Sequence, residues 1–371
     1  MPLTSRVDIH VGYSCNERCK FCYYIQTVND RTKKKDLSTE EVKRRIRYIR
    51  SRGIRTLDFT GGEPTIRTDL AELARYSKSL GFESVSLITN GIRLAQPAYA
   101  ASCVEAGIDD FLISIHGYEP AVHDRVTGVH GSFAKALEAV TQLRRYPVKI
   151  RANCVISGVN YTGATEILAL FHSLGIQTAN FIFFNPIVEA DWRSAPELNV
   201  KYIVAAPYLK RAIDAYRDKI QKITVRYIPF CLMTGYESYV TNMPQIQYDP
   251  DEWDYLVRTT IREGRLVSTA ALLAGMLLYP SKKRSLKKGW NTFKHEAIKY
   301  FLQIKNRVKG EACGRCSLNL ICDGLWRKYA ALNGFGELKA VTGPKIEDPV
   351  YFLETNRNYF PGSERDRSVS A

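Results

Sequence analysis

Three cysteines near the N-terminus have the spacing to hold a metal centre. Cys15, Cys19 and Cys22 form a C-x3-C-x2-C pattern on a short polar segment after an apolar run. Thiolates are soft ligands that suit iron–sulfur clusters and zinc. A structural zinc site takes four ligands, so three thiolates on one loop leave a metal incompletely held. In a four-iron cluster they leave one iron without a protein ligand, and chemistry can take place at that open position.

A second motif follows one strand-and-helix unit later. Residues 55–60 are predicted to form a strand that ends at the sequence GGEPT, residues 61–65. The two glycines permit positive φ and a close approach of a ligand to the backbone, and the proline donates no backbone hydrogen bond. Backbone carbonyls and the Glu63 carboxylate suit an ammonium group, whereas a cradle of backbone amides would suit a phosphate.

In this order, the two motifs resemble those of the radical S-adenosylmethionine (radical SAM) enzymes, including the aromatic Phe21 before Cys22. The resemblance implies that the three cysteines hold a [4Fe–4S] cluster whose open iron is chelated by SAM. It implies that the amino group of SAM's methionine portion is bound by Gly61, Gly62, Glu63 and Pro64. An external one-electron donor such as a flavodoxin or ferredoxin would reduce the cluster, and SAM would be cleaved to a 5′-deoxyadenosyl radical. The alternative is a chance cysteine cluster or a zinc knuckle.

Strand-like and helical segments alternate through the first half of the chain. Strands are predicted at residues 7–13, 55–60, 83–89, 109–115, 148–156 and 179–184, and helices at 40–52, 71–80, 98–106, 133–145 and 163–174. Ser38 and Glu41 have the spacing of a capping box at the first helix. This alternation predicts an α/β fold with a mainly parallel sheet and right-handed crossovers. The six units fit the partial (β/α)6 TIM-like barrel that the resemblance implies.

The carboxyl ends of the later predicted strands carry further candidates, because ligands in such folds bind there. We nominate Asn90, Ser114 and Asn153. In the radical SAM family, polar groups on comparable strands contact the ribose and carboxylate of SAM, and the resemblance implies the same here. The alternative is ordinary turn and strand chemistry. His116 and His123 have the side chains of an acid–base pair, but we expect a structural role for both.

A second group of cysteines lies far downstream. Cys313, Cys316 and Cys322 form a C-x2-C-x5-C pattern, and Cys231 stands alone in a segment predicted to be extended, 227–237. The spacing resembles the auxiliary-cluster domains called SPASM and Twitch. Cysteine counting favours one auxiliary [4Fe–4S] cluster, the Twitch form. Two alternatives remain: a zinc site with four cysteine ligands, or a cluster without Cys231 and with an iron open to substrate, as in the similar molybdopterin-precursor synthase. In the second alternative, Cys231 is a catalytic hydrogen-atom donor.

We therefore divide the chain into a radical SAM core barrel, residues 1–190, and a mostly helical auxiliary-cluster region, residues 191–371, in which no regular strands are expected. This region contains an insert at about residues 266–310. Residues 266–281 are uncharged and fall short of the roughly 20 apolar residues that span a bilayer. Residues 282–310 hold ten basic residues against Glu296. Apolar residues recur at helical spacing, at Phe293, Ala297, Phe301, Ile304 and Val308.

The periodicity in residues 282–310 predicts one amphipathic basic helix that lies on an anionic membrane surface or docks an acidic partner. The alternative is a helix packed on the barrel with a solvated basic face. The net charge of the whole chain, +15, also suits an acidic partner, including nucleic acid. Nine cysteines without an apolar signal segment indicate a reducing, cytoplasmic compartment, with the insert providing a peripheral contact to a membrane.

The resemblance implies hydrogen abstraction from an unactivated C–H bond of a small-molecule, carrier-bound or peptide substrate. We favour an oxidation or crosslinking in which the auxiliary cluster accepts an electron, that is, an oxidoreductase. One alternative is a redox-neutral epimerase or rearrangement enzyme in which Cys231 or Cys154 returns a hydrogen atom. A non-enzyme alternative is a zinc-stabilised protein that binds RNA or membrane. Only about six residues precede the first strand, which argues against a leader-peptide domain and weakens a peptide substrate.

Overall fold

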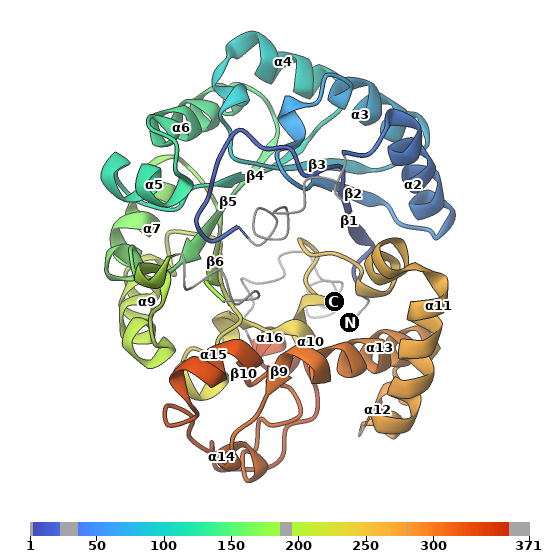
Figure 1. The fold of residues 1–371 in the computed structure, drawn as a ribbon, viewed down its shortest axis with the longest axis vertical. Helices are drawn as coiled ribbons and strands as arrows, with labels where there is room; N and C mark the ends of the chain where they lie inside the picture. Colours follow the sequence, from blue (N-terminus) through green and yellow to red (C-terminus); the bar gives the residue numbers. More distant parts are fainter. Residues whose placement is uncertain (1–2, 23–35, 186–194, 280, 356–371) are drawn as a thin grey trace, which may run out of the picture.

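The chain folds around one parallel sheet that curls into an open barrel (Figure 1). The computed structural model describes residues 3–22, 36–185, 195–279 and 281–355. The strands follow one another in chain order: β1 (Arg6–His10), β2 (Thr56–Thr60), β3 (Ser84–Thr89), β4 (Asp110–Ser114), β5 (Lys149–Ile156), β6 (Thr178–Phe183), β7 (Lys222–Arg226) and β8 (Val240–Thr241). The predicted α/β class and the partial barrel are confirmed.

Helices cover the outer face of the sheet. They are α2 (Thr39–Ser51), α3 (Leu70–Ser79), α4 (Pro97–Glu105), α5 (Pro120–Thr127), α6 (Ser132–Leu143), α7 (Ala164–Ser173) and α9 (Tyr202–Tyr216), which form the outer ring in Figure 1. Ser38 and Glu41 form the predicted capping box at α2. Side chains alternate between the two faces of a strand, so Ile9, Phe59 and Phe111 pack outward in the hydrophobic core.

The expectation of no regular strand after residue 186 is wrong, because β7 and β8 extend the sheet to Thr241. The β7 sequence begins with Lys222 and ends with Arg226, which made it look like an exposed segment. Both side chains are buried because Lys222 pairs with Asp249 and Asp251, and Arg226 pairs with Glu252. The division at residue 190 stays a prediction.

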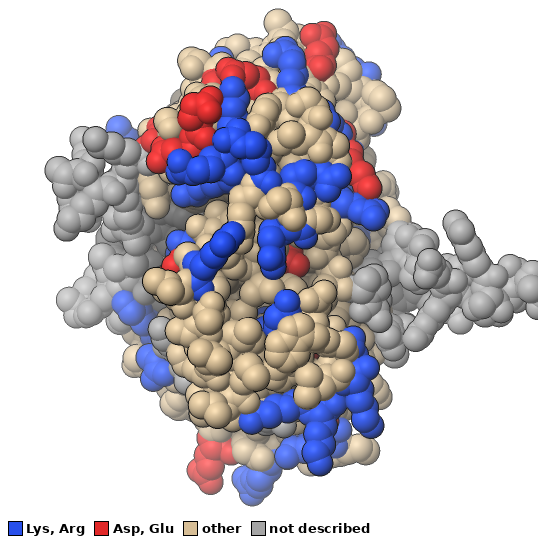
Figure 2. Space-filling view, turned by 90° about the vertical axis from the view of Figure 1, so that its right-hand side faces the viewer, with Lys and Arg blue, Asp and Glu red and all other residues tan. Residues whose placement is uncertain are grey.

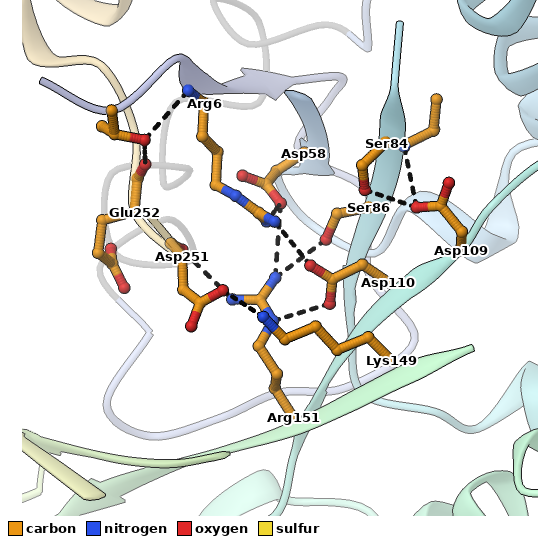
Figure 3. A network of polar contacts seen from close by, with 12 residues as sticks. Arg6, Asp58, Ser84, Ser86, Asp109, Asp110, Lys149, Arg151, Asp251 and Glu252 are labelled. Carbon is orange, nitrogen blue, oxygen red and sulfur yellow. Dashed lines mark hydrogen bonds and ion pairs between the residues drawn. The ribbon is translucent and has the colours of Figure 1, made fainter. Parts of the chain in front are cut away.

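The inner face of the sheet carries a buried network of charges toward the amino ends of the strands, drawn in part in Figure 3. Arg6 pairs with Asp58 at 2.6 Å and with Asp110 at 2.7 Å, and Arg151 pairs with Asp110 at 2.8 Å. Lys149 adds an ion pair with Asp251. We call this network, with Lys222, Arg226, Asp249 and Glu252, the lumen floor.

The segment after α10 (Met243–Ile246) closes the open side of the barrel between β8 and β1. Thr4 donates its backbone N–H to the Gln247 carbonyl at 2.8 Å, and Arg6 forms a parallel bridge with Trp253. Arg258 pairs with Asp8 of β1 at 2.6 Å. The same segment provides the floor carboxylates, so long-range ion pairs join the C-terminal half to the barrel.

The remaining elements lie below the barrel mouth in Figure 1: α11 (Tyr255–Leu278), α12 (Lys282–Lys287), α13 (Trp290–Asn306), β9 (Arg307–Val308), α14 (Glu311–Gly314), β10 (Leu325–Trp326), α15 (Arg327–Asn333) and α16 (Tyr351–Thr355). The single basic helix predicted over residues 282–310 is wrong, because the chain breaks at Gly289, where φ is +110°. Within the described ranges, no helix is long and apolar enough to cross a membrane.

Candidate active site

The cysteine loop and the GGEPT turn lie together at the carboxyl ends of β1 and β2. Gly62 donates its backbone N–H to the Gly12 carbonyl at 2.8 Å, and Glu63 donates its own to the Ser14 carbonyl at 2.8 Å. A Cβ at position 62 would lie 2.1 Å from the Ser14 carbonyl oxygen. Glycine is therefore required there, because any side chain would push the cysteine loop away from the turn.

The buried carboxylate of Glu63 braces these strand ends. Its Oε1 accepts hydrogen bonds from the Thr65 backbone at 2.9 Å and from the hydroxyls of Thr65 and Thr89 at 2.6 Å. Its Oε2 accepts from the backbone N–H of Asn90 at 2.8 Å. These four bonds within the chain hold the Glu63 carboxylate in place. Because Oε2 accepts only one of them, it keeps acceptor capacity, and the role of Glu63 toward an ammonium group stays a prediction.

Asn90 extends this brace into the cysteine loop. Its Nδ2 donates to Oδ1 of Asn16 at 2.8 Å, so the residue after Cys15 is held directly by the end of β3. On the other side, Arg18 and Lys20 donate backbone N–H groups to the carbonyls of Thr127 and Val126 at 2.9 and 2.8 Å. The loop is thus fixed at both flanks.

The thiols of the loop lie in a partly buried and acidic environment. Burial is the largest cause that raises the pKa of Cys15 to about 12, and the negative charges of Glu63 and Glu17 contribute to the same shift. The pKa of the Cys19 thiol is also well above its usual value because of burial, with Glu17 adding to the shift. Thiolates here therefore need a cation to balance them, and iron bound to three thiolates supplies that charge. The donor set fits a cluster ligated by Cys15, Cys19 and Cys22.

Phe21 and the two histidines form the wall behind the loop. The Phe21 ring meets the His116 ring edge-on at 4.6 Å. Nδ1 of His116 accepts from the backbone N–H of Val155 at 3.1 Å, and Nδ1 of His123 accepts from that of His116 at 3.0 Å. Burial lowers the pKa of both, that of His123 to about 4, so both are neutral acceptors. The predicted structural role of the histidines is confirmed.

A polar row crosses the inner face of the barrel above the floor. The register pairs Ser114 with Asn153, Asn153 with Asn180, and Asn180 with Thr224. Paired residues on neighbouring strands share a face of the sheet, so all four point into the lumen. Oδ1 of Asn153 and Nδ2 of Asn180 are buried and have no partner among the described residues. They are therefore available to a polar ligand.

Sequence reasoning missed Asn180 and Thr224. Asn180 is 1% exposed, and its Oδ1 accepts from the Thr224 hydroxyl at 2.8 Å, which fixes the amide. Asn180 stands three residues before the end of a strand, and Thr224 lies on a strand that was not predicted. The alternation of side chains along β6 could have indicated that Asn180 points inward. It could not have indicated that Thr224 is its hydrogen-bond partner.

Cys154 faces the opposite way from Asn153. It is fully buried in the hydrophobic core, on the helix-facing side of β5. This position contradicts the alternative in which Cys154 returns a hydrogen atom to a substrate in the lumen. Cys103 on α4 is also a core residue.

The downstream cysteines meet at one small pocket, which is lined by Cys231, Cys313, Cys316 and Cys322 among other residues. Cys231 lies in a 3-10 turn, Phe230–Leu232, and not in the extended segment that was predicted, because Tyr227 adopts a positive φ of 67° and turns the chain. The structure therefore joins a residue of the β7–β8 connection to three residues that lie 82 to 91 positions later in the chain.

Backbone donors surround these four sulfurs. Val341 donates its N–H to Cys316 Sγ and Gly324 donates to Cys322 Sγ, both at 3.4 Å. Burial raises the pKa of Cys231, Cys313 and Cys322, while backbone hydrogen bonds to each oppose the shift. Hydrogen bonds to sulfur stabilise cluster thiolates and adjust cluster potential, so the donor set fits an auxiliary cluster. In the described part of the chain, no group of three or more His, Cys, Asp or Glu side chains has an arrangement that could hold a single metal ion.

The barrel is similar to known proteins. Residues 9–174, fewer than half of the chain, match the family model described as Radical SAM superfamily. Over 182 residues, 48% of the chain, this protein is 32% identical to a "Probable GTP 3',8-cyclase" of Saccharolobus solfataricus, with 56% of that protein covered. Over 161 residues, 43% of the chain, it is 35% identical to a "Probable GTP 3',8-cyclase" of Thermococcus kodakarensis, with 50% covered.

The chain thus spans about half the length of the curated relatives it matches. Among solved structures, the crystal structure titled "Native anSMEcpe with bound AdoMet and Cp18Cys peptide" superposes with a TM-score of 0.53 at 16% identity. That match covers 96% of this chain and 97% of the other. The similarity in fold therefore extends from the barrel through the C-terminal region.

Proposed function

We propose that this protein is a radical SAM enzyme in which two [4Fe–4S] clusters cooperate. The observation that carries the proposal is the hydrogen-bonded unit of the cysteine loop, the GGEPT turn and Asn90. When bound, the first cluster and SAM supply an adenosyl radical that abstracts hydrogen from a C–H bond of the substrate. The family match and the fold of the radical SAM domain support this function.

In this proposal, the chain's own residues orient and shield the reactants. Cys15, Cys19 and Cys22 hold the first cluster. The backbone carbonyls of residues 61–64 face the methionine portion of SAM, and Glu63 holds that turn. Ser114, Asn153 and Asn180 orient polar groups in the lumen through hydrogen bonds, with Asn180 fixed by Thr224.

We further propose that Cys231, Cys313, Cys316 and Cys322 hold the auxiliary cluster. Their common pocket and the backbone donors at the sulfurs support this assignment, and the fold similarity over the C-terminal region agrees with it. The position of Cys231 at this pocket favours a ligand over a hydrogen-atom donor. An auxiliary cluster beside the barrel provides an acceptor for an electron from a product radical, which favours an oxidation or crosslinking.

A redox-neutral cyclisation or rearrangement is the second candidate. It is favoured by the names of the relatives, each of which is called a probable GTP 3',8-cyclase. The lumen floor limits how a nucleotide substrate could be bound. Its cations are each paired with a carboxylate, namely Arg6, Arg151, Lys222 and Arg226. These cations are therefore committed to the fold, and a triphosphate would have to be bound by other residues.

Anaerobic reconstitution with iron and sulfide counting tests the two clusters. Wild type is expected to hold about eight irons, as two four-iron clusters. The Cys15→Ala/Cys19→Ala/Cys22→Ala variant and the Cys231→Ala/Cys313→Ala/Cys316→Ala variant should each hold about four. Only the first should lose reductive SAM cleavage, measured as 5′-deoxyadenosine. Cys103→Ala/Cys154→Ala is the matched control and should change neither readout. An iron count unaffected by the first triple substitution would contradict the proposal.

Incubation with GTP and SAM separates the two reaction classes for the substrate that the relatives' names suggest. A product with the mass of GTP would indicate cyclisation. A product two hydrogens lighter would indicate oxidation. If GTP is unchanged while SAM is cleaved, the substrate belongs to another class.

A further inference from the structure

The outer face of α11 is apolar and exposed. The helix is uncharged from Leu266 to its end at Leu278. Its inner side packs on α13, where a Cβ at Gly275 would lie 2.1 Å from the Ala297 carbonyl oxygen. This close contact buries Ala271 and Ala297 and leaves the other side of α11 without a partner among the described residues.

The basic helix predicted from the sequence uses its apolar side for this packing. Phe293 and Ala297 are 3% and 0% exposed, in a cluster with Tyr279. The membrane or partner contact expected for that side is therefore not available, because α11 covers it. Any such contact must be made elsewhere on the insert.

Exposed apolar side chains gather on α11 and recur on the next two helices. Leu266 is 88% exposed, Leu273 59% and Leu277 78%, with spacings of seven and four residues that place them on one side of the helix. Of the twelve exposed large hydrophobic residues in the described ranges, seven lie between residues 266 and 290. We call the following set the outer leucine face: Leu266, Leu273, Leu277, Leu278, Leu286 and Trp290.

The charges on the helices of the outer leucine face are mainly positive. The sequence contains no Asp or Glu from residue 264 to residue 295. Asp348 pairs with Arg284 of α12 and with Lys288 directly after it, whereas Lys283 and Lys287 on the same helix are exposed. Figure 2 shows this side of the molecule as a broad area of uncharged residues with Lys and Arg gathered above and below it. An apolar patch with a cationic border matches a surface that is apolar inside and anionic at its boundary.

We propose that the outer leucine face docks on the surface of an anionic lipid bilayer. The leucines and Trp290 would enter the boundary between headgroups and acyl chains, and the lysines would contact anionic headgroups. A second copy of the chain fits the face less well, because a two-fold contact brings the same lysine border together from both copies. The contact places the barrel at a membrane surface and gives it access to lipid-embedded or lipid-linked substrates.

Flotation with lipid vesicles tests the proposal on the full chain. Wild type is expected to float with vesicles of phosphatidylcholine containing about one third phosphatidylglycerol, and to stay behind with phosphatidylcholine alone. Leu273→Ser/Leu277→Ser should lower the partition coefficient by at least about tenfold, because two apolar side chains no longer enter the boundary. Lys283→Glu/Lys287→Glu should lower it by about fivefold or more per residue.

Matched controls lie on the opposite side of the barrel in Figure 1. Ile203→Ser/Val204→Ser on α9 removes two apolar side chains that are 42% and 44% exposed. Lys135→Glu/Arg145→Glu at α6 makes the same charge change. Both controls should bind vesicles as wild type does, and circular dichroism should show all four variants folded.

Three outcomes would overturn the proposal. Wild type that does not float with anionic vesicles has no such docking surface. Binding that the leucine variant leaves unchanged is mediated by another part of the chain. A wild-type dimer in light scattering that becomes a monomer in the leucine variant, without vesicle binding, would make this face a contact between copies. The vesicle test needs neither cluster nor SAM, so it stands apart from the proposed function.

Discussion

Replacing Asp110 by Asn tests whether the lumen floor holds the barrel together. The two oxygens of Asp110 each accept from a different guanidinium, Arg6 at 2.7 Å and Arg151 at 2.8 Å, and both arginines are nearly fully buried. Burial alone would raise the pKa of Asp110, but Arg151 and Arg6 outweigh it, so the pKa lies below its usual value. The carboxylate is therefore charged, and removing the charge leaves two buried cations undercompensated.

The magnitude follows from what the two arginines retain. Breaking a buried ion pair from one side costs about 3–5 kcal/mol. Arg6 keeps Asp58 at 2.6 Å, while Arg151 keeps Asp58 at 3.7 Å and the Asp251 carbonyl at 3.3 Å. Because partial compensation remains, we expect the free energy of unfolding to fall by about 3 kcal/mol, at the lower end of that range.

Urea titration followed by circular dichroism measures this loss. Urea is preferable to guanidinium chloride because it does not screen charges. Asp109→Asn is the matched control: Asp109 is the preceding residue, and its ion pair with Lys78 is 38% exposed on the aspartate side. Its loss should cost less than about 1 kcal/mol. If Asp110→Asn and Asp109→Asn are equally stable, the floor network does not carry the barrel's stability.

Two further outcomes follow from single residues. Gly62→Ala should lower the iron retained after reconstitution and abolish most SAM cleavage, because its Cβ would lie 2.1 Å from the Ser14 carbonyl oxygen. Gly336→Ala is the control and should do neither, because its added Cβ meets nothing within 4 Å. Full iron retention in Gly62→Ala would refute the packing argument. His123 is held neutral with its pKa lowered from 6.5 to about 4 by burial, which the nearby Asp124 opposes only in part. Its contribution is complete above pH 6.5 and is lost as the pH falls from 6.5 to 4, by about 3 kcal/mol. His123→Gln should flatten that part of a urea-unfolding profile against pH, and an unchanged slope would assign the loss to other groups.

The barrel was predicted from local patterns in the sequence. The strands from β1 to β6 lie within a few residues of their predicted bounds, and so do the helices between them except α5, which was not predicted. Alternation and helical periodicity are properties of neighbouring residues. The cysteine loop and the GGEPT turn were identified for the same reason. Their contact through the backbone of Gly12 and Ser14 needed only that β1 and β2 be adjacent.

Long-range contacts decided the rest. β7 was missed because its cations are neutralised by carboxylates 27 and 29 positions later, as Lys222 with Asp249 and Asp251 shows. The amide of Asn180 is fixed by the Thr224 hydroxyl on that missed strand. The insert was predicted as one basic helix, but α11 covers its apolar side and exposes leucines instead. Sequence spacing identifies residues that can form a face, and only the tertiary structure determines which face is already covered.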